Sequence, residues 1–458
     1  MDIPAVIFRQ YDIRGVVGEE LSPQVAHAVG RALATIARQK VGRDPRLAVG
    51  RDNRPSGELL ARAMRDGIAG AGGAAVDVGM LPTPALYFAL HELDVHGGIQ
   101  VTGSHNPPEF NGFKMVVAGE TIYGEEIQQI RELIENDELD SGYGTIEAND
   151  SVLMRYSDTV VSIVGSLARP VKVAVDCGNG VASLVAESIL VRLGADVVPL
   201  YCESDGNFPN HHPDPTVTEN LRDLQEAVRG TGAQLGIAFD GDGDRIGAVD
   251  ENGKVVFGDQ LLVLFGRDLV DRTDDRGAVI FDVKCSNILA DKLRDIGLEP
   301  VIWKTGHSLI KAKMKELRSP LAGEMSGHMF FAADYYGYDD AIFAAARLLS
   351  YVARKGGPLS TLLADLPPTF ATPEIRVDCP EERKFTVVED AARYFAERYD
   401  VLTLDGVRIS FPDGWGLIRA SNTQPVLVMR FEASTKDGLA NHRTEVESWL
   451  RSQGISAL

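Results

Sequence analysis

Short apolar segments alternate with segments of helical spacing along most of this chain. In the first such stretch, apolar runs at 46–52, 74–79 and 98–102 are separated by segments at 57–72 and 84–93 whose apolar residues recur at helical intervals. Runs of this kind, each roughly four to eight residues long, predict buried strands that are joined by crossover helices. The alternation therefore favours an α/β fold built on a mostly parallel sheet.

The alternation restarts twice and then stops. A polar segment at 137–150, which is a candidate linker, precedes a second round at 171–240 in which a helix is expected at 180–193. A third round occupies 261–317. Past the proline-rich break at 366–368, strands are expected at 401–411, 416–420 and 426–432. They alternate less with helices, which predicts a smaller α+β domain. We therefore expect four domains, at 1–149, 150–253, 254–366 and 367–458.

Charge and composition exclude several functions. The formal net charge of -20 at pH 7 argues against nucleic acid as a partner, because phosphate backbones attract basic surfaces. The N-terminus lacks a signal-peptide pattern and no run approaches about 18 apolar residues, so no membrane segment is expected. The cysteines are scattered and form no Cys-x-x-Cys pair, which is typical of reduced thiols in a cytoplasmic protein. An anionic substrate would need a locally basic site in this acidic chain.

The most specific local motif is D-G-D-G-D-R at 240–245, which lies between two apolar runs. Asp240, Asp242 and Asp244 would repel one another in a tight turn unless a cation lay between them. Ligation by oxygen alone suits a hard divalent cation such as Mg²⁺. A solvated acidic loop stays open as an alternative.

A calcium loop of the EF-hand type is a second alternative for this motif. Glu251 is the twelfth residue counted from Asp240, as that loop requires. The sixth position, however, is Arg245 instead of glycine, and the flanking segments have the pattern of strands instead of helices. These departures disfavour the calcium loop.

A second motif, T-G-S-H-N-P-P at 102–108, follows the third apolar run. Ligands bind near the carboxyl ends of strands in open α/β sheets. Ser104 is therefore a candidate phosphoryl acceptor and His105 a candidate proton carrier. An ordinary polar turn, capped by serine and asparagine, would have the same composition.

Four further polar segments carry cations or hydrogen-bonding groups. The segment G-E-M-S-G-H at 323–328 combines a carboxylate, a hydroxyl and an imidazole, which suits vicinal sugar hydroxyls. The segment R-A-S-N-T at 419–423 combines one cation with short donors, which suits a phosphate. Y-D-I-R-G at 11–15 and K-T-G-H at 304–307 add further cations. Each segment alone could be a simple turn.

Together and in this order, these six motifs resemble those of the α-D-phosphohexomutases, most closely the bacterial phosphomannomutase/phosphoglucomutase group. They extend from Y-D-I-R-G near the N-terminus to R-A-S-N-T in the last predicted domain. The resemblance implies an α/β protein whose four domains surround a central cleft in a heart shape. Three of those domains would share one α/β topology with mixed sheets, and the fourth would be the smaller α+β domain.

The resemblance also implies roles for individual residues. Ser104 would carry the phosphoryl group, and a phosphate oxygen on it would join Asp240, Asp242 and Asp244 as ligands of Mg²⁺. Arg245 would lie beside that phosphate. His105 and Lys114 are the candidates for proton transfer. The implied substrate-binding positions are Tyr11, Arg14, Lys284, Lys304, His307, Glu324, Ser326, His328, Arg419, Ser421, Asn422 and Thr423. Among these, Glu324 and Ser326 would bind sugar hydroxyls, and the positions from 419 to 423 would bind the non-reacting phosphate.

The implied reaction interconverts the 1- and 6-phosphates of mannose, glucose or both. It would run through a 1,6-bisphosphate intermediate, and glucose 1,6-bisphosphate would act as an activator. The partners would be small hexose phosphates, and a monomer is compatible with the sequence, although the oligomeric state stays open. Three alternatives remain at this point: a phosphoglucosamine mutase, a phosphatase that uses phosphoserine, and a non-catalytic sugar-phosphate sensor or calcium-binding module.

Overall fold

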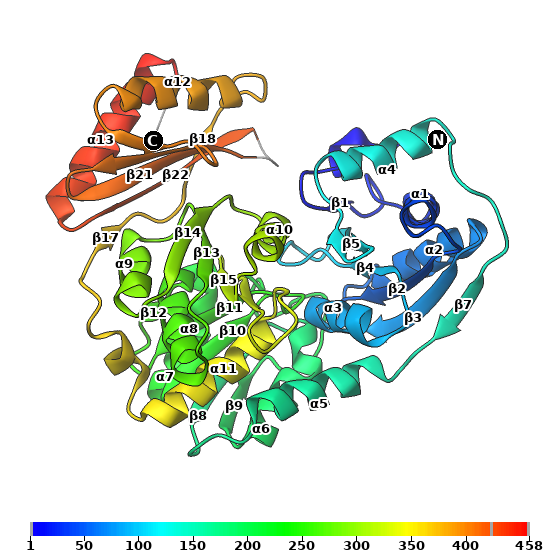
Figure 1. The fold of residues 1–458 in the computed structure, drawn as a ribbon, viewed down its shortest axis with the longest axis horizontal. Coiled ribbons are helices and arrows are strands. Elements are labelled where there is room, and N and C mark those ends of the chain that lie inside the picture. The colour runs from blue at the N-terminus through cyan, green and yellow to red at the C-terminus, as the bar shows by residue number, and fades with distance from the viewer. Residues whose placement is uncertain (1–2, 422–424, 456–458) are drawn as a thin grey trace.

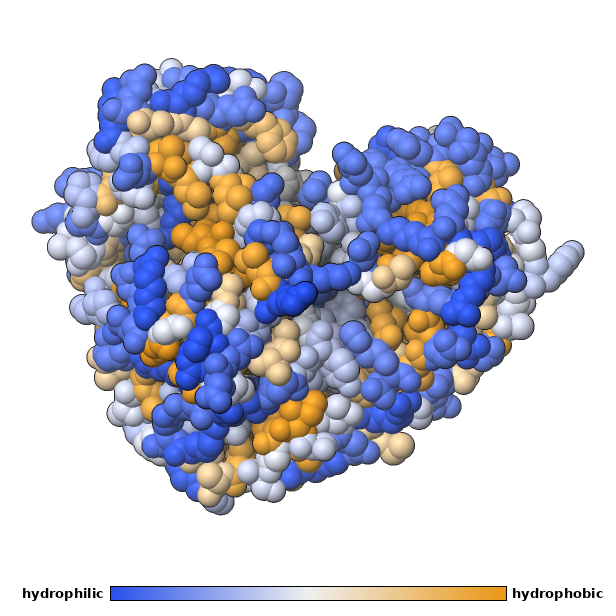
Figure 2. Space-filling view, viewed as in Figure 1, coloured by the Kyte–Doolittle hydropathy of each residue, from blue (hydrophilic) through white to orange (hydrophobic). Residues whose placement is uncertain are grey.

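A computed structural model describes residues 3–421 and 425–455 of the chain. Four consecutive units form a heart (Figure 1): the first and the last unit are separate lobes, and the second and third units join them from below. Figure 2 shows that the surface is hollowed between the two lobes. The predicted heart-shaped, four-domain α/β architecture is therefore confirmed.

The first sheet contains a four-strand unit with a defined pairing. Its central strand β2 (Arg46–Arg51) pairs in parallel with both β3 (Ala74–Met80) and β4 (Gly97–Val101). Strand β5 (Phe110–Val117) then pairs with β4 in antiparallel orientation. The sheet is therefore mixed, because one antiparallel strand follows the parallel ones.

The second and third sheets repeat this pairing. In the second sheet the central strand is β8, and in the third it is β13; each has two parallel neighbours and one antiparallel strand beyond. The strands of these repeats are β8 (Lys172–Asp176), β9 (Asp196–Leu200), β10 (Leu235–Phe239), β11 (Ile246–Asp250), β13 (Ala278–Asp282), β14 (Glu299–Trp303), β15 (Leu321–Gly323) and β16 (Met329–Phe331). The shared topology expected for three domains is thus observed strand by strand.

The fourth unit is a mainly antiparallel sheet against which two helices pack. Its strands are β17 (Phe370–Ala371), β18 (Ile375–Asp378), β19 (Asp400–Leu402), β20 (Val407–Phe411), β21 (Gly414–Ala420) and β22 (Val426–Ala433). The first sheet has three further strands, β1 (Ile13–Val16), β6 (Glu120–Thr121) and β7 (Thr145–Ala148), and the second has one, β12 (Val255–Val256). Neighbours in the order β17-β22-β21-β20-β19 are antiparallel.

Helices connect the strands of the first three units and cover the fourth sheet. They are α1 (Pro23–Val41), α2 (Gly57–Gly70), α3 (Thr83–Glu92), α4 (Glu125–Glu135), α5 (Val152–Val164), α6 (Ala186–Leu193), α7 (Arg222–Thr231), α8 (Gly258–Arg272), α9 (Asn287–Asp295), α10 (His307–Leu317), α11 (Ala341–Lys355), α12 (Lys384–Ala396) and α13 (Lys436–Ser452). In the described part of the chain, none of them is long and apolar enough to cross a membrane.

One hydrophobic core joins the second and third units to part of the first, and α11 is a central helix of this core. Most residues of α11 are buried, and the helix contacts α5, α6 and α8. Asp340 caps its N-terminus by accepting a hydrogen bond from the backbone N–H of Phe343 at 2.8 Å, which satisfies a donor that has no partner within the helix. The cap fixes where α11 begins. It thereby also fixes the position of Asp339, the residue that precedes Asp340.

The structure differs from the sequence expectations at several elements. The polar segment at 137–150 is only partly a linker, since β7 pairs in parallel with β3 at the edge of the first sheet. The single strand expected at 401–411 is two strands, β19 and β20, because the chain turns between them at Gly406, whose φ of 88° suits glycine. The helix expected at 180–193 is a short 3₁₀ turn (Val181–Leu184) followed by α6.

Candidate active site

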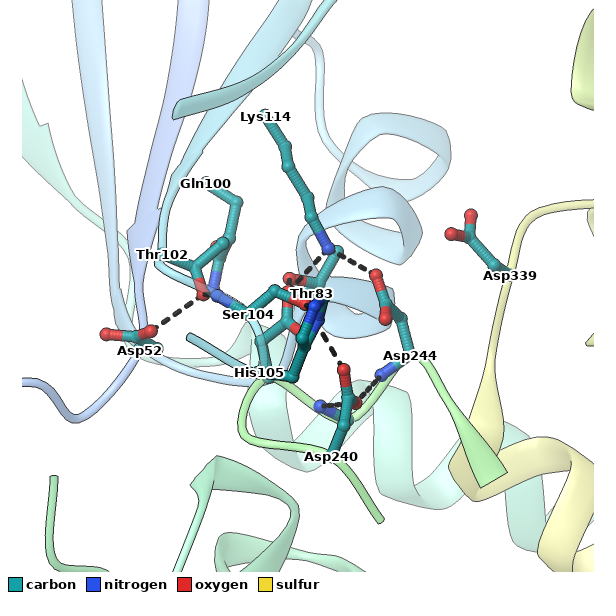
Figure 3. Close-up of polar contacts among 12 residues, drawn as sticks. Asp52, Thr83, Gln100, Thr102, Ser104, His105, Lys114, Asp240, Asp244 and Asp339 are labelled. Atoms are coloured by element: carbon teal, nitrogen blue, oxygen red, sulfur yellow. Dashed lines mark hydrogen bonds and ion pairs between the residues drawn. The ribbon is translucent and has the colours of Figure 1, made fainter. Parts of the chain in front are cut away.

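The same position in each of the first three units carries a polar loop. This loop joins the third strand of the unit to its antiparallel neighbour, and it contains Ser104 in the first unit, residues 240–245 in the second and residues 324–328 in the third. Ser104 Oγ lies 3.2 Å from Asp240 Oδ2, and Arg245 forms a backbone bridge with His328. Repetition of one topology therefore brings three polar loops to one centre, and Figure 3 shows the first two, with Ser104 close to Asp240.

The serine loop is held in an unusual conformation by buried polar groups. Ser104 has a φ of 51°, in the left-handed region that non-glycine residues seldom adopt. Its backbone N–H donates to Thr102 Oγ1 at 2.8 Å, and Thr102 Oγ1 donates to Asp52 Oδ2 at 2.7 Å. Arg54 Nη2 donates to the carbonyl of Ser104 at 2.8 Å and is itself paired with Asp52. Such strain persists only where the surroundings fix it, as they do here.

The hydroxyl of Ser104 has an imidazole and a carboxylate as neighbours. Ser104 Oγ lies 3.2 Å from His105 Nδ1 and 3.2 Å from Asp240 Oδ2. Burial and the nearby cations Arg245 and Arg14 hold the pKa of His105 well below its usual value. The imidazole of His105 is therefore neutral near pH 7 and is able to accept a proton at the atom that faces Ser104.

The acidic loop folds around one of its own carboxylates. Asp240 Oδ1 accepts hydrogen bonds from the backbone N–H groups of Gly243, Asp244 and Arg245 at 3.0, 3.0 and 3.1 Å. These bonds close the turn and direct the side chains of Asp240, Asp242 and Asp244 inward, where all three are fully buried. The solvated acidic loop that the sequence left open is therefore not what the chain forms.

These carboxylates fit a divalent metal ion. One oxygen from each of Asp240, Asp242 and Asp244 lies within 4.8 Å of the others. Oδ1 of Asp242 and Oδ1 of Asp244 are buried and accept no hydrogen bond from the described residues. Burial and repulsion from the other two carboxylates raise the pKa of Asp240 well above its usual value. A set of three oxygen donors, two of them unsatisfied, suits a hard cation such as Mg²⁺.

Lys114 approaches the same loop from the first unit. It extends from β5, and its Nζ lies 2.7 Å from Asp242 Oδ2 and also contacts Asp244 (Figure 3). Although burial opposes a charge, these carboxylates raise the pKa of Lys114. Lys114 in turn holds the pKa of Asp242 below its usual value despite burial. Lys114 is therefore a buried ammonium ion that offsets part of the negative charge of the loop.

A buried aspartate, Asp339, lies between two histidines beside this centre. Asp339 Oδ2 is 3.4 Å from His307 Nδ1 and 3.3 Å from His328 Nδ1, and Lys311 Nζ donates to Asp339 Oδ1 at 2.9 Å. The contacts with the histidines are close enough for ion pairs but do not have hydrogen-bond geometry. On its other side, His328 Nε2 accepts a hydrogen bond from Arg245 Nε at 3.0 Å. Asp339 thus links the third unit to Arg245 of the acidic loop.

The loop at 324–328 is fixed by its neighbours in the third unit. Glu324 Oε1 accepts a hydrogen bond from the backbone N–H of Gly306 at 2.6 Å, and burial raises the pKa of Glu324. Asp282, at the end of β13, accepts from the backbone N–H of Met325 at 3.1 Å and from Thr305 Oγ1 at 3.1 Å. Ser326 is only partly buried and adjoins this anchored segment.

Tyr11, Thr305 and Arg419 join the first, third and fourth units. Tyr11 Oη donates to the carbonyl oxygen of Thr305 at 3.0 Å, and Arg419 Nη2 donates to Tyr11 Oη at 3.4 Å. Asp405 orients Arg419 by accepting from its Nε at 2.9 Å. The end of β21 is thereby held next to the first unit.

The remaining predicted positions are distributed around this centre. Arg14 donates to Asn106 Oδ1 at 2.6 Å and pairs with Asp12, so it adjoins the serine loop. Lys284 lies 3.7 Å from Asp282, whereas the side chain of Lys304 is exposed. Ser421 is buried directly after β21. Asn422 and Thr423 lie outside the described residues.

Several carboxylates and one arginine that organise the site were not predicted from the sequence. They are Asp52, Arg54, Asp282, Asp339 and Asp405. Asp52 and Asp282 lie at the end of the first parallel strand of their units, where each carboxylate accepts a hydrogen bond from a neighbouring loop of the site. An aspartate at the end of an apolar run was a usable signal for these two.

Four family models match this chain one after another. They are described as the alpha/beta/alpha domains I, II and III of phosphoglucomutase/phosphomannomutase, at 5–141, 154–253 and 257–370, and as its C-terminal domain, at 374–448. The chain belongs to the phosphoglucomutase/phosphomannomutase family. The resemblance inferred from the six motifs is therefore confirmed.

Individual members of the family are similar to this chain along nearly its whole length. A phosphomannomutase/phosphoglucomutase of Pseudomonas aeruginosa is 48% identical over 452 residues, which cover 98% of this chain and 96% of that protein. A probable phosphoglucosamine mutase of Methanopyrus kandleri is 34% identical over 446 residues, which cover 96% of each. The crystal structure of a phosphoglucomutase/phosphomannomutase family protein from Burkholderia thailandensis superposes with a TM-score of 0.91 at 43% identity and covers 98% of both chains.

Proposed function

We propose that this chain is a phosphohexomutase that interconverts the 1- and 6-phosphates of mannose, glucose or both. The observation that carries the proposal is the position of Ser104, whose Oγ lies 3.2 Å from a carboxylate of the three-aspartate loop. A hydroxyl beside a cation site is the arrangement that a phosphoserine intermediate needs. The family and the 48% identity to a phosphomannomutase/phosphoglucomutase support this reading.

The catalytic cycle starts from phosphorylated Ser104. A hexose 1-phosphate binds with its phosphate at Arg419 and the donors of 421–423, and with its hydroxyls at Glu324 and Ser326. The 6-hydroxyl then attacks the phosphorus, the bond to Ser104 Oγ breaks, and a 1,6-bisphosphate forms. His105, 3.2 Å from Ser104 Oγ, takes up the proton that the 6-hydroxyl loses and returns it to the departing serine oxygen.

Charge stabilisation completes the chemistry. Asp240, Asp242 and Asp244 would hold Mg²⁺, and the bound ion would supply positive charge to the transferring phosphoryl group. The side chains of Arg245 and Lys114 supply further positive charge beside the three aspartates. Because most of the catalysis of phosphoryl transfer comes from positioning and electrostatics, these groups act by being fixed in place.

The bisphosphate must turn around before the second transfer. Its 1-phosphate would then face Ser104, and the 6-phosphate would occupy the site at Arg419. Rephosphorylation of Ser104 releases the hexose 6-phosphate. Glucose 1,6-bisphosphate would restore the enzyme when the serine has lost its phosphate. We include a cytoplasmic location in this proposal, because free thiols and soluble hexose phosphates both suit it.

A mutase assay tests the proposal directly. The protein would be incubated with Mg²⁺, a trace of glucose 1,6-bisphosphate and, separately, glucose 1-phosphate, mannose 1-phosphate or glucosamine 6-phosphate. We expect both hexose 6-phosphates to form without release of inorganic phosphate. Stoichiometric inorganic phosphate would indicate a phosphatase, turnover of the glucosamine phosphate alone would indicate a phosphoglucosamine mutase, and no turnover would favour a sensor.

A further inference from the structure

Two cysteines of the second unit lie side by side, away from the catalytic groups. Cys177 follows β8 and Cys202 follows β9, and their Sγ atoms are 3.3 Å apart. Both are free thiols; Cys177 is buried, and Cys202 is partly exposed. A disulfide requires an S–S distance of about 2.05 Å, so the two segments that carry the cysteines would have to move only slightly closer together.

The backbone at both strand ends brings the sulfurs together. The strands β8 and β9 are parallel neighbours with Asp176 opposite Leu200, so the segments that follow them leave the sheet at the same edge. Tyr201 has a φ of 50° and Asn179 a φ of 58°, and these left-handed turns are tied to each other by a hydrogen bond from the N–H of Asn179 to the carbonyl of Tyr201 at 2.9 Å. Strained backbone that neighbours hold in place is a frequent mark of functional positions.

The two thiols differ in access and in acidity. The hydrogen bond between the sulfurs, together with burial, raises the pKa of Cys177, whereas the same hydrogen bond lowers the pKa of Cys202. The thiolate is the reactive form of cysteine, and attack needs access. Cys202 therefore has the features of an attacking sulfur, and Cys177 has those of a buried resolving thiol.

We propose that Cys177 and Cys202 form a reversible disulfide when the protein meets hydrogen peroxide. The thiolate of Cys202 attacks the peroxide, becomes a sulfenic acid and releases hydroxide, which takes up a proton to give water. The thiol of Cys177 then displaces the sulfenic oxygen, which leaves as a second water, and the S–S bond forms. Two thiols are thus oxidised and one peroxide is reduced. Exchange with a dithiol restores both thiols.

The disulfide would act on the acidic loop through a short path. The N–H of Val181, four residues after Cys177, donates to the carbonyl of Gly241 at 3.1 Å. The packing between is tight, since a Cβ on Gly180 would come within 2.7 Å of that same carbonyl. Movement of the loop that begins at Cys177 would therefore shift Gly241, between two of the three aspartates. We expect oxidation to lower catalytic turnover.

Intact mass and peptide mapping of the full chain test this inference. The protein would be treated with hydrogen peroxide, alkylated and digested. We expect a mass loss equal to two hydrogen atoms, two fewer alkylated cysteines, and one linked peptide pair that joins Cys177 to Cys202. Dithiothreitol should reverse all three changes. Absence of that linked pair from the oxidised wild type would overturn the inference, whatever the mutase activity is.

Variants test the link to turnover. Cys202→Ser should neither lose the two hydrogens nor lose activity, and Cys379→Ser, at another buried free thiol, should respond like the wild type. In the wild type we expect turnover to fall by about tenfold, as displacement of a catalytic group would cause. A linked Cys177–Cys202 pair with unchanged turnover would overturn the coupling to the acidic loop.

Discussion

The carboxylate of Asp339 lies 3.3 Å from Nδ1 of His328. The opposite nitrogen of this imidazole, Nε2, accepts a hydrogen bond from Arg245 at 3.0 Å, so the ring carries its proton on the side of Asp339. Although burial opposes ionisation, Lys311 and His307 hold the pKa of Asp339 well below its usual value. Asp339 is therefore a fixed anion that orients His328 and, through it, Arg245.

Asp339→Asn should lower kcat more than it raises KM. The variant keeps the shape of the side chain but loses the charge that orients His328, so Arg245 would be less well placed for the transition state. Groups that orient functional side chains are typically worth about tenfold to hundredfold in activity. Steady-state kinetics on the 1-phosphates give both constants, with the exposed Asp291→Asn as a matched control. A raised KM with an unchanged kcat in Asp339→Asn would contradict a positioning role.

Asp242→Asn should weaken metal binding. This residue is fully buried, pairs with Lys114 at 2.7 Å and offers an Oδ1 without a hydrogen bond from the described residues. Removing one of three anionic donors should raise the Mg²⁺ concentration needed for half-maximal activity by about tenfold or more. The measurement is a Mg²⁺ titration of mutase activity, supported by calorimetry of Mg²⁺ binding. A half-maximal concentration equal to that of the wild type would exclude Asp242 as a ligand.

Polar motifs that directly follow predicted strands located part of the candidate site. The motifs at Ser104 and at 240–245 follow apolar runs, and each lies where the third strand of its unit ends; the segment at 324–328 follows β15, a three-residue strand that was not predicted. Because carboxyl ends of parallel strands share one edge of a sheet, local patterns were enough to locate these loops. The recurrence of one topology was expected from the similar alternation of the three stretches and from the family resemblance, but the pairing of individual strands was not, since the repeats have little sequence in common.

Other features depend on contacts that leave no local pattern. Helix α1 was not predicted; it is rich in alanine, and its buried residues from Val25 to Ala37 are interrupted only at His27 and Arg31, so they extend beyond a single face. The edge strand β7 was read as part of a linker, because its four residues are all exposed and it is held mainly by backbone pairing with β3. Asp339 and Asp405 contact partners that are distant or not patterned in the sequence. A single aspartate in a polar segment therefore did not predict either contact.

Ser104→Ala should abolish phosphoryl transfer and leave sugar-phosphate binding largely intact. The hydroxyl is the only group removed, whereas the loop is held by the backbone contacts to Thr102 and Arg54. Without an acceptor oxygen the enzyme cannot carry a phosphoryl group, so turnover should fall by at least about a thousandfold. Phosphorus NMR of the enzyme incubated with glucose 1,6-bisphosphate should show a phosphoserine signal in the wild type only. Near-normal turnover of the variant would refute Ser104 as the acceptor.

Arg419→Ala should chiefly raise KM for the hexose 1-phosphate. Arg419 lies at the end of β21, its Nε is held by Asp405 at 2.9 Å, and it faces the first unit through Tyr11. A charged hydrogen bond to the non-reacting phosphate is worth about 1.5–3 kcal/mol, which corresponds to a tenfold to hundredfold rise in KM. Arg419→Lys keeps the charge but loses the paired donors of the guanidinium, so its KM should fall between those of the alanine variant and the wild type. Asp405→Asn leaves Arg419 intact but removes its anchor, and a smaller rise in KM is expected. If kcat fell in all three variants while KM stayed constant, the cation would act on the transferring group and not on the phosphate at the far end of the sugar.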